Sequence, residues 1–533
     1  MTKGNYSSQQ QQQTIEFYQQ QLEIARETGD AQREVTSLND LGKVYLFLKQ
    51  YKQAIDYFQQ LLQRTKEIGD AQGECKALNN LGVSYESLEQ YQQAINYLQQ
   101  SLEIARTIGD AKGQVNSLTN LGIAYESLRQ YDRAIDYYQQ CLVIQKDIDE
   151  RQGQAESLSN LGKVCKKLGQ YEKAIDYYQQ LLGIQRERGD AKGQADSLNN
   201  LGFAYDFLKQ YSRAIDYLEQ SLALKREMGD AKGQGYTLSA LGIACESLEQ
   251  HQRAIDYFQQ SVETTHKSGD TEGKALFLSF LGKAYYCSEE NNSLQQYKKA
   301  IDCFEQSLTI RRELGDTQGE ADSLSSIGNA YEALGQYQRA IAYHEQALTT
   351  QRNLGNTQEA AACLSNLGDA YRSMGQYQQA IDYYQQSLAI QQEFSDAKGQ
   401  ATSLNALGIA YRLLRQYQQA VDCYQQSLTI QRKIGNAPGE AKSWFSLGIA
   451  FTELARTSDA IAQGAAPKAI AAYQNARQLY QEMGRNAEVK ECDKAIGHLT
   501  QANGLKAGTR GLLRWIHRLW RQIRTQLRRW GWR

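Results

Sequence analysis

Residues 191–230 read AKGQADSLNNLGFAYDFLKQYSRAIDYLEQSLALKREMGD, and they contain two successive helical patterns. In the first pattern, Leu198, Leu201 and Tyr205 fall at positions i, i+3 and i+7, which is the spacing of one buried side of a helix. The second pattern repeats this spacing and ends at Gly229, because a helix commonly ends with a glycine in the left-handed conformation. The stretch therefore predicts a helical hairpin that buries its apolar sides by stacking on copies of itself.

The Leu-Gly pair of this hairpin recurs along the whole chain. It returns in steps of 40 residues from Leu41 to Leu281, after a step of 46 as Ile327-Gly, and again in steps of 40 to Leu447. The period predicts eleven hairpins. They span residues 31–484, with insertions near residues 287–296 and 456–466. The chain has two prolines in 533 residues, which fits a fold that is helical nearly throughout.

The hairpin matches the spacing of a known repeat. Leu198, Leu201, Gly202, Tyr205 and Ala214 follow the pattern of the tetratricopeptide repeat, although that repeat usually has about 34 residues. Over roughly residues 12–484 the chain resembles the extended 40-residue variant of kinesin light chains and Pins/LGN-type scaffolds. The resemblance implies an all-α fold, a right-handed superhelical solenoid of helical hairpins, with a concave groove that receives protein or peptide partners.

The segments outside the repeats differ in composition. We predict a disordered Gln-rich leader at residues 1–11 and a half-repeat that caps the stack at residues 12–30. A capping helix is predicted at residues 485–503, and a linker at residues 504–511. Residues 512–533 are predicted to form a basic, Trp-rich amphipathic helix.

The composition of the chain indicates the cellular compartment in which the protein is found. The nine cysteines include no CxxC pair, so we predict small buried thiols in a reducing compartment. The N-terminal segment is polar and lacks the apolar core of a secretory signal, and no stretch is apolar enough to span a membrane. We expect a cytoplasmic protein, peripheral at the inner face of a membrane if the C-terminal helix attaches there.

The side of each first helix opposite the packed stripe is the predicted partner surface. In residues 191–230 this first-helix face contains Asp196, Asn199, Asn200, Phe203 and Asp206. Two positions recur as rows. The asparagine row consists of Asn80, Asn120, Asn160, Asn200 and Asn366. The acidic row consists of Glu86, Glu126, Asp206, Glu246 and Glu332, and its position is taken elsewhere by Lys166, Arg372 and Arg412.

These two rows indicate the chemistry of a partner. An amide offers both a donor and an acceptor, which suits the backbone of an extended peptide. A row of acids favours a basic partner through electrostatic complementarity. We therefore predict a groove for a basic, extended segment of a protein. The competing interpretation is that the asparagines bond to neighbouring helices while the acids form a solvated face.

The C-terminal segment separates apolar from basic residues. Residues 505–533 carry nine Lys or Arg and no acid. The predicted membrane-binding or partner-binding residues are Arg514, Trp515, Arg518, Leu519, Trp520, Arg521, Ile523, Arg524, Leu527, Arg528, Arg529, Trp530 and Trp532. This pattern is typical of an interfacial helix at an anionic membrane. Docking on the protein's own repeats and binding to a separate protein remain alternatives. Nucleic acid is the least favoured partner, because in a segment that binds nucleic acid the aromatic residues would interleave with the basic ones, whereas here they lie on one face.

Nothing in the sequence indicates catalysis. The five histidines show neither metal-ligand spacing nor a nucleophile–base pair, and we predict no cofactor, no metal and no enzymatic activity. We predict a non-enzymatic interaction scaffold or adaptor, attached peripherally to a membrane by its C-terminal helix. The first alternative is a self-regulated adaptor whose C-terminal helix docks on its own repeats. The second and more remote alternative is a protein associated with nucleic acid.

Overall fold

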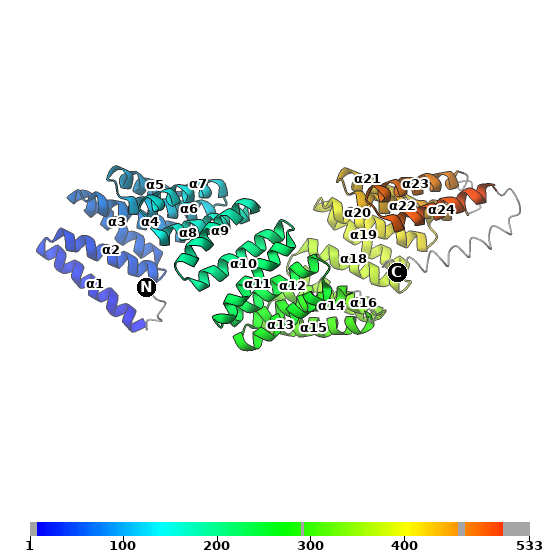
Figure 1. Ribbon diagram of the computed structural model, residues 1–533, viewed down its shortest axis with the longest axis horizontal. Helices are drawn as coiled ribbons and strands as arrows, with labels where there is room; N and C mark the ends of the chain where they lie inside the picture. Colours follow the sequence, from blue (N-terminus) through cyan, green and yellow to red (C-terminus); the bar gives the residue numbers. More distant parts are fainter. Residues whose placement is uncertain (1–7, 289–292, 457–463, 505–533) are drawn as a thin grey trace. The chain divides into compact units, whose positions relative to one another are not determined.

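The computed structural model describes residues 8–288, 293–456 and 464–504 (Figure 1). Among these residues the chain is helical nearly throughout and contains no strand. It divides into two compact units, Met1–Ser268 and Gly269–Arg533, which we describe separately. The prediction of an all-α fold built from helical hairpins is confirmed.

The N-terminal unit begins with one helix, α1 (Ser8–Thr28), which starts before the boundary predicted at residue 12. Hairpins follow, and in each the even-numbered helix comes first. They are α2 (Ala31–Phe47) with α3 (Tyr51–Ile68), α4 (Ala71–Ser87) with α5 (Tyr91–Thr107), α6 (Ala111–Ser127) with α7 (Tyr131–Asp147), α8 (Arg151–Lys167) with α9 (Tyr171–Glu187), α10 (Ala191–Phe207) with α11 (Tyr211–Glu227), and α12 (Ala231–Ser247) with α13 (His251–Ser268).

The C-terminal unit continues the same hairpins. They are α14 (Thr271–Cys287) with α15 (Ser293–Leu314), α16 (Thr317–Ala333) with α17 (Tyr337–Asn353), α18 (Thr357–Ser373) with α19 (Tyr377–Glu393), α20 (Ala397–Leu413) with α21 (Tyr417–Lys433), and α22 (Ala437–Leu454) with α23 (Ala465–Glu482). The last described helix is α24 (Asn486–Gly504). The predicted linker beyond Gly504 and the predicted basic helix at residues 512–533 lie outside the described residues.

Local capping sets the helix boundaries. At the start of α10, the Asp190 carboxylate accepts a hydrogen bond from the Gly193 amide at 2.9 Å, which satisfies one of the free amides of the first turn. After α11, Gly229 adopts a φ of 68°, a left-handed conformation that glycine takes without strain. Asp or Asn takes the N-cap position in most of the other repeats, so these short turns recur.

Within a hairpin the two helices approach closely at the glycine of the Leu-Gly pair. A Cβ atom at Gly202 would come within 2.6 Å of Leu218 Cγ on the partner helix. In other repeats this glycine packs against an aromatic ring, as Gly162 does against Tyr178. The position therefore requires glycine because no side chain fits between the two helices.

The core of each unit runs along the stack. Each helix packs against the helix before it and the helix after it within its unit. One cluster of buried residues extends from Ile95 in α5 to Ala214 in α11 without a break. The repeats from α5 to α11 therefore share a continuous core built from contacts between neighbours.

The cysteines are buried with one exception. Eight of the nine are buried as predicted, whereas Cys287 is exposed, so that part of the prediction is wrong. Cys287 lies at the helical register where Phe47 and Phe207 are 60% and 57% exposed. Side chains at this position of the first helix point away from the packed stripe, whatever residue is present, because their direction is set by the helix backbone.

Candidate partner-binding site

The asparagine row lies half-buried on the even-numbered helices, and two of its members connect adjacent repeats. Asn80 Nδ2 donates a hydrogen bond to Asn39 Oδ1 at 3.1 Å, and Asn120 Nδ2 donates to Asn79 Oδ1 at 3.0 Å. For these two asparagines the structure matches the competing interpretation, bonding between helices. Asn80 and Asn120 each still keep one N–H and both lone pairs of the side-chain oxygen for a partner.

The other asparagines behave differently. Asn200 Oδ1 accepts a hydrogen bond from Lys166 Nζ at 3.1 Å, and its Nδ2 donates to the Asp196 carbonyl at 3.0 Å. The side chains of Asn160 and Asn366 form no hydrogen bond with any described residue. The row therefore mixes amides that hold repeats together with amides that have donors and acceptors to spare.

Most of the acidic row is held by the next repeat. Glu86 Oε1 accepts a hydrogen bond from Ser127 Oγ at 3.2 Å. Glu126 Oε1 lies 2.8 Å from Lys167 Nζ in an ion pair. In the C-terminal unit, Glu332 Oε1 accepts from a serine of the following repeat at 3.0 Å. These carboxylates have protein partners, so their charge is partly compensated before any ligand arrives.

Asp206 is different from these glutamates. Its Oδ1 is buried and has no hydrogen-bond partner among the described residues. Its side chain is one methylene shorter than that of glutamate, and Ser247, the counterpart of Ser127, donates instead to the Ile243 carbonyl at 3.2 Å. Burial raises the pKa of the Asp206 carboxyl, since its charged form loses solvation. The carboxylate therefore lacks the cation that would compensate its desolvation.

Three neighbours complete what we call the Asp206 site, which consists of Lys166, Asn200, Phe203 and Asp206. Asn200, Phe203 and Asp206 recur every three residues along α10. Lys166, on α8, bonds Asn200 and lies with its Nζ 6.0 Å from the centre of the Phe203 ring. Burial and the charge of Lys163 lower the pKa of Lys166. The site thus joins an aromatic ring, an amide whose oxygen Lys166 already bonds, the Lys166 ammonium group and a carboxylate whose Oδ1 has no hydrogen-bond partner among the described residues.

Comparison with protein families decides the identity of this fold. The tetratricopeptide repeat model matches seven segments, and a second tetratricopeptide repeat model matches one more. The first matches residues 5–67, 73–147, 153–227, 291–353, 321–393, 358–433 and 399–465, and the second matches residues 237–272. The chain belongs to the tetratricopeptide-repeat family. The predicted resemblance is confirmed.

Solved structures with similar repeats are distant in sequence. BtubC from P. vanneervenii is 20% identical over 43% of this chain and 90% of that chain, with a TM-score of 0.37. A kinesin-light-chain-like protein of Podosopora anserina is 24% identical over 38% and 96%, with a TM-score of 0.33. The quorum sensor NprR from B. thuringiensis is 16% identical over 64% and 98%, with a TM-score of 0.40. No curated protein matches the chain.

In the C-terminal unit of this tetratricopeptide-repeat protein, the acidic row gives way to paired arginines. Arg372 Nη2 lies 2.8 Å from Asp369 Oδ1, and its Nε donates to the Tyr384 hydroxyl at 3.2 Å. Arg412 Nη1 lies 3.2 Å from Glu453 Oε1, and the side chains of Arg412 and Glu453 are 11% and 6% exposed. The change of sign predicted from the sequence is present, but these arginines are bound within the protein.

Neither a metal site nor a membrane span occurs in the part of the tetratricopeptide-repeat array that the structure describes. No group of three or more His, Cys, Asp or Glu residues in the described ranges could hold a metal ion. None of the described helices is both long and apolar enough to cross a membrane. The basic C-terminal residues from Arg514 to Trp532 lie outside the described residues.

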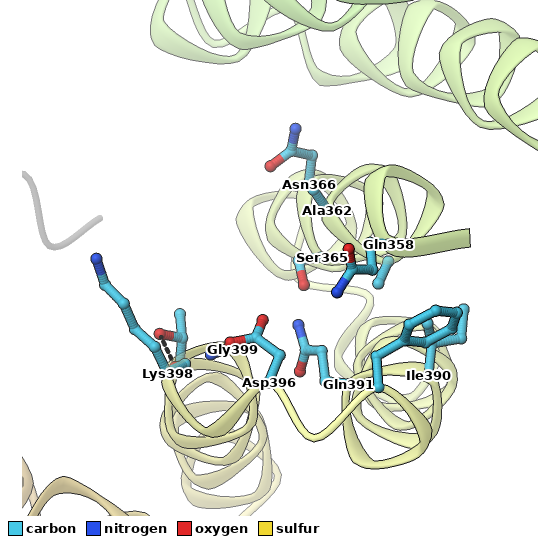
Figure 2. Close-up of a pocket in the computed structure, with 12 residues that line it drawn as sticks. Gln358, Ala362, Ser365, Asn366, Ile390, Gln391, Asp396, Lys398 and Gly399 are labelled. Carbon is cyan, nitrogen blue, oxygen red and sulfur yellow. Dashed lines mark hydrogen bonds between the residues drawn. The ribbon is translucent and has the colours of Figure 1, made fainter. Parts of the chain in front are cut away.

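One feature of the repeats was missed by sequence reasoning. A pocket of about 350 Å³ lies where α18, the end of α19 and the start of α20 meet (Figure 2). Its lining includes Gln358, Gln391, Phe394 and Asp396. The signal available in the sequence is the N-cap residue of the first helix, which is Asp396 at this pocket and Asn356 and Asn436 in the two flanking repeats.

Proposed function

We propose that this tetratricopeptide-repeat protein is a non-enzymatic interaction scaffold whose N-terminal unit binds a basic, extended segment of a protein partner. Binding would use the first-helix face, with the Asp206 site at its centre. Family membership supports a role in protein interaction. The observation that carries the proposal is the Asp206 carboxylate, whose buried Oδ1 has no hydrogen-bond partner in the part of the chain that the structure describes.

The charge argument favours a cationic residue at the Asp206 site. A carboxylate without a hydrogen-bond donor bears an uncompensated desolvation cost, and a lysine or arginine of a partner would remove it. The glutamates at the equivalent position already accept hydrogen bonds from the next repeat, so the same partner gains less there. The Phe203 ring, one turn before Asp206, offers a surface for the aliphatic stem of that cation.

The asparagine row supplies contacts to the backbone of the partner. Asn160 has no side-chain hydrogen bond with any described residue, so both of its polar atoms are available to an extended peptide. Asn80 is already bonded to Asn39. We therefore expect Asn160 to contribute more to binding than Asn80.

Fluorescence anisotropy of the full chain with a short, end-blocked lysine-rich peptide tests this proposal. Asp206→Asn removes the charge and keeps the shape, and we expect it to weaken binding about tenfold, because hydrogen bonds to charged groups contribute roughly 1.5–3 kcal/mol. The matched control is Glu126→Gln, whose carboxylate is paired with Lys167. Equal effects of both substitutions, or equally tight binding of a glutamate-rich peptide, would overturn the proposal.

We also propose that residues 512–533 attach this scaffold to an anionic membrane. The support is the sequence, in which tryptophans and other apolar residues fall on one side of a helix and arginines on the other. Each basic residue near an anionic surface contributes about 1 kcal/mol, which falls with salt. The competing proposal is that this segment docks on the protein's own repeats.

Co-sedimentation with liposomes separates these two proposals. The full chain and a chain that ends at Gly504 are compared on anionic and neutral vesicles at two salt concentrations. Membrane attachment predicts that only the full chain pellets, only with anionic lipid, and less at high salt. If neither chain pellets, membrane attachment is wrong, and a gain in peptide affinity on truncation would support docking on the repeats.

A further inference from the structure

In several repeats, the residue at the position of the acidic row is bound by the residue 41 positions later, on the first helix of the next repeat. Glu86 accepts a hydrogen bond from Ser127, and Glu126 forms an ion pair with Lys167. In the C-terminal unit, Glu332 accepts from the serine at this spacing. The spacing therefore identifies the side chain that is placed to compensate the charge of each residue in the row.

This pairing fails at two consecutive repeats, which carry charges of opposite sign. The residue 41 positions after Lys166 is Phe207, whose ring has no acceptor and stacks on Tyr171 with the ring centres 4.7 Å apart. The residue 41 positions after Asp206 is Ser247, which donates to a carbonyl of its own helix. A lysine without a carboxylate on α8 and a carboxylate without a cation on α10 are therefore found in adjacent repeats.

The charge of Lys166 is not compensated by any carboxylate of the described chain. Its side chain is half-buried, and its Nζ donates to a neutral acceptor, Asn200 Oδ1, at 3.1 Å. Lys163, one turn earlier on α8, is exposed and forms no hydrogen bond or ion pair with any described residue. Burial and the charge of Lys163 both lower the pKa of Lys166, because each disfavours the protonated amine. A carboxylate between the two lysines would oppose both effects.

The sequence around Lys163 explains why no acid of the protein lies beside it. On α8, the residues three and four positions away from Lys163 are Ser, Asn and two Lys, and these are its neighbours on the helix surface. In the other repeats from α4 to α12, its position is apolar and is occupied by Val83, Ile123, Phe203 and Ile243. The α8 repeat thus replaces one apolar residue and one acid of the first-helix face by two lysines.

We propose that the partner segment carries an acidic residue that binds Lys163 and Lys166, about three residues away from the basic residue that pairs with Asp206. Neighbouring helices lie roughly 8–10 Å apart, and an extended chain advances about 3.3 Å per residue, which gives this spacing. A carboxylate forms charge-assisted hydrogen bonds with both ammonium groups. This inference rests on the proposed function, because it adds one residue to the basic, extended segment that the face binds.

The acidic residue sets the register of the partner on the face. The acidic row offers carboxylates on both sides of α8, at Glu86, Glu126, Asp206 and Glu246. A segment that contains only basic residues places one of them over the two lysines in any register that spans α8, and like charges repel there. Specificity therefore combines attraction of an acid with rejection of a base at the same place.

Fluorescence anisotropy of the full chain with two end-blocked, lysine-rich peptides tests this proposal. The peptides differ only in their central residue, which is glutamate in one and glutamine in the other. We expect the glutamate peptide to bind about fivefold more tightly. Without an acid-binding position it should bind more weakly, because its net positive charge is lower. Lys163→Gln combined with Lys166→Gln should abolish the preference, whereas the matched control Lys167→Gln should keep it, since Lys167 is already paired with Glu126.

Asp206→Asn separates this inference from the proposed function. It should weaken the binding of both peptides and keep the preference for glutamate, because the two lysines are intact. If neither peptide binds the wild-type chain, the proposed function is wrong and this inference is wrong with it. If both peptides bind but the wild-type chain shows no preference for glutamate, or if the double lysine variant keeps that preference, only this inference is overturned.

Discussion

Replacing His344 by phenylalanine should stabilise the C-terminal unit. His344 is fully buried in α17, and neither of its ring nitrogens has a hydrogen-bond partner among the described residues. Its counterparts in other repeats are aromatic or aliphatic, and one of them is Tyr178. The ring of His344 packs against Gly328 with the geometry by which Tyr178 packs against Gly162, so a six-membered ring fits without overpacking.

The gain follows from the two unpaired nitrogens. An unsatisfied buried polar group costs roughly 1–3 kcal/mol, and phenylalanine removes both the N–H and the acceptor. We expect His344→Phe to raise the free energy of local opening by about 2 kcal/mol at neutral pH. The substitution also replaces polar by apolar buried surface, which acts in the same direction.

The gain should increase in acid. Burial lowers the pKa of His344 to about 4, against the opposing effect of the Asp369 carboxylate on α18. The unfolded state binds a proton near pH 6.5, so the wild-type chain loses stability as the pH falls from about 6.5 to about 4. Phenylalanine takes up no proton, and the difference between the two chains should therefore grow by about 2 kcal/mol on going to about pH 5.

Hydrogen–deuterium exchange measures this difference locally. Exchange of peptides from α16 and α17, corrected for intrinsic rates, gives the free energy of opening of this hairpin in each chain. Groups other than His344 titrate in both chains and cancel in the comparison. A gain that stays constant between the two pH values, or a loss of protection in His344→Phe, would refute the reasoning.

Five further substitutions test the packing of the repeats, and four of them form matched pairs. Tyr178→Phe should stabilise the protein by about 1 kcal/mol, because the buried Tyr178 hydroxyl has no hydrogen-bond partner among the described residues, whereas Tyr384→Phe should cost about 1.5 kcal/mol, because that hydroxyl donates to a carboxylate at 2.7 Å. Gly202→Ala should cost about 2 kcal/mol through overlap with the facing helix, whereas Gly183→Ala, with no neighbour within 4 Å, should stabilise α9 by about 0.5 kcal/mol. Glu453→Ala should cost about 3 kcal/mol, because it removes the carboxylate that pairs with the largely buried Arg412 guanidinium. Urea denaturation, read together with exchange in the affected helices, measures all of these.

Each of these predictions has an outcome that would contradict it. Equal losses in the two tyrosine variants would mean that the Tyr178 hydroxyl has a partner, such as a bound water. Equal effects of the two alanine substitutions would mean that the hairpin helices can separate at no cost. A neutral Glu453→Ala would show that the guanidinium reaches solvent.

The helices and their pairing could be predicted because each position of the repeat is observed many times in one chain. The Leu-Gly pair sets the closest contact of every hairpin, and the core is built from contacts between neighbours in sequence. The exposure of Cys287 could have been predicted in the same way, from the register that Phe47 and Phe207 share with it.

The pairing of side chains on the first-helix face could not be predicted from the repeat pattern. Glu86 reaches a serine of the next repeat, and Asp206, shorter by one methylene, does not. Likewise the side-chain oxygen of Gln431 accepts a hydrogen bond from its N-cap residue, Asn436, whereas the oxygen of Gln391 has no partner among the described residues. The N-cap residue that follows Gln391 is Asp396, whose carboxylate cannot donate. Such differences depend on distances of about one bond length, which only the folded geometry sets.

The central claim is that the first-helix face of the N-terminal unit binds a basic, extended peptide. Photo-cross-linking tests it most directly, with the lysine-rich peptide carrying a benzophenone and the full chain analysed by mass spectrometry. We predict cross-links on peptides from α8 and α10 around Phe203, which Asp206→Asn reduces and Glu126→Gln leaves intact. Cross-links confined to odd-numbered helices, or unchanged in Asp206→Asn, would contradict the claim.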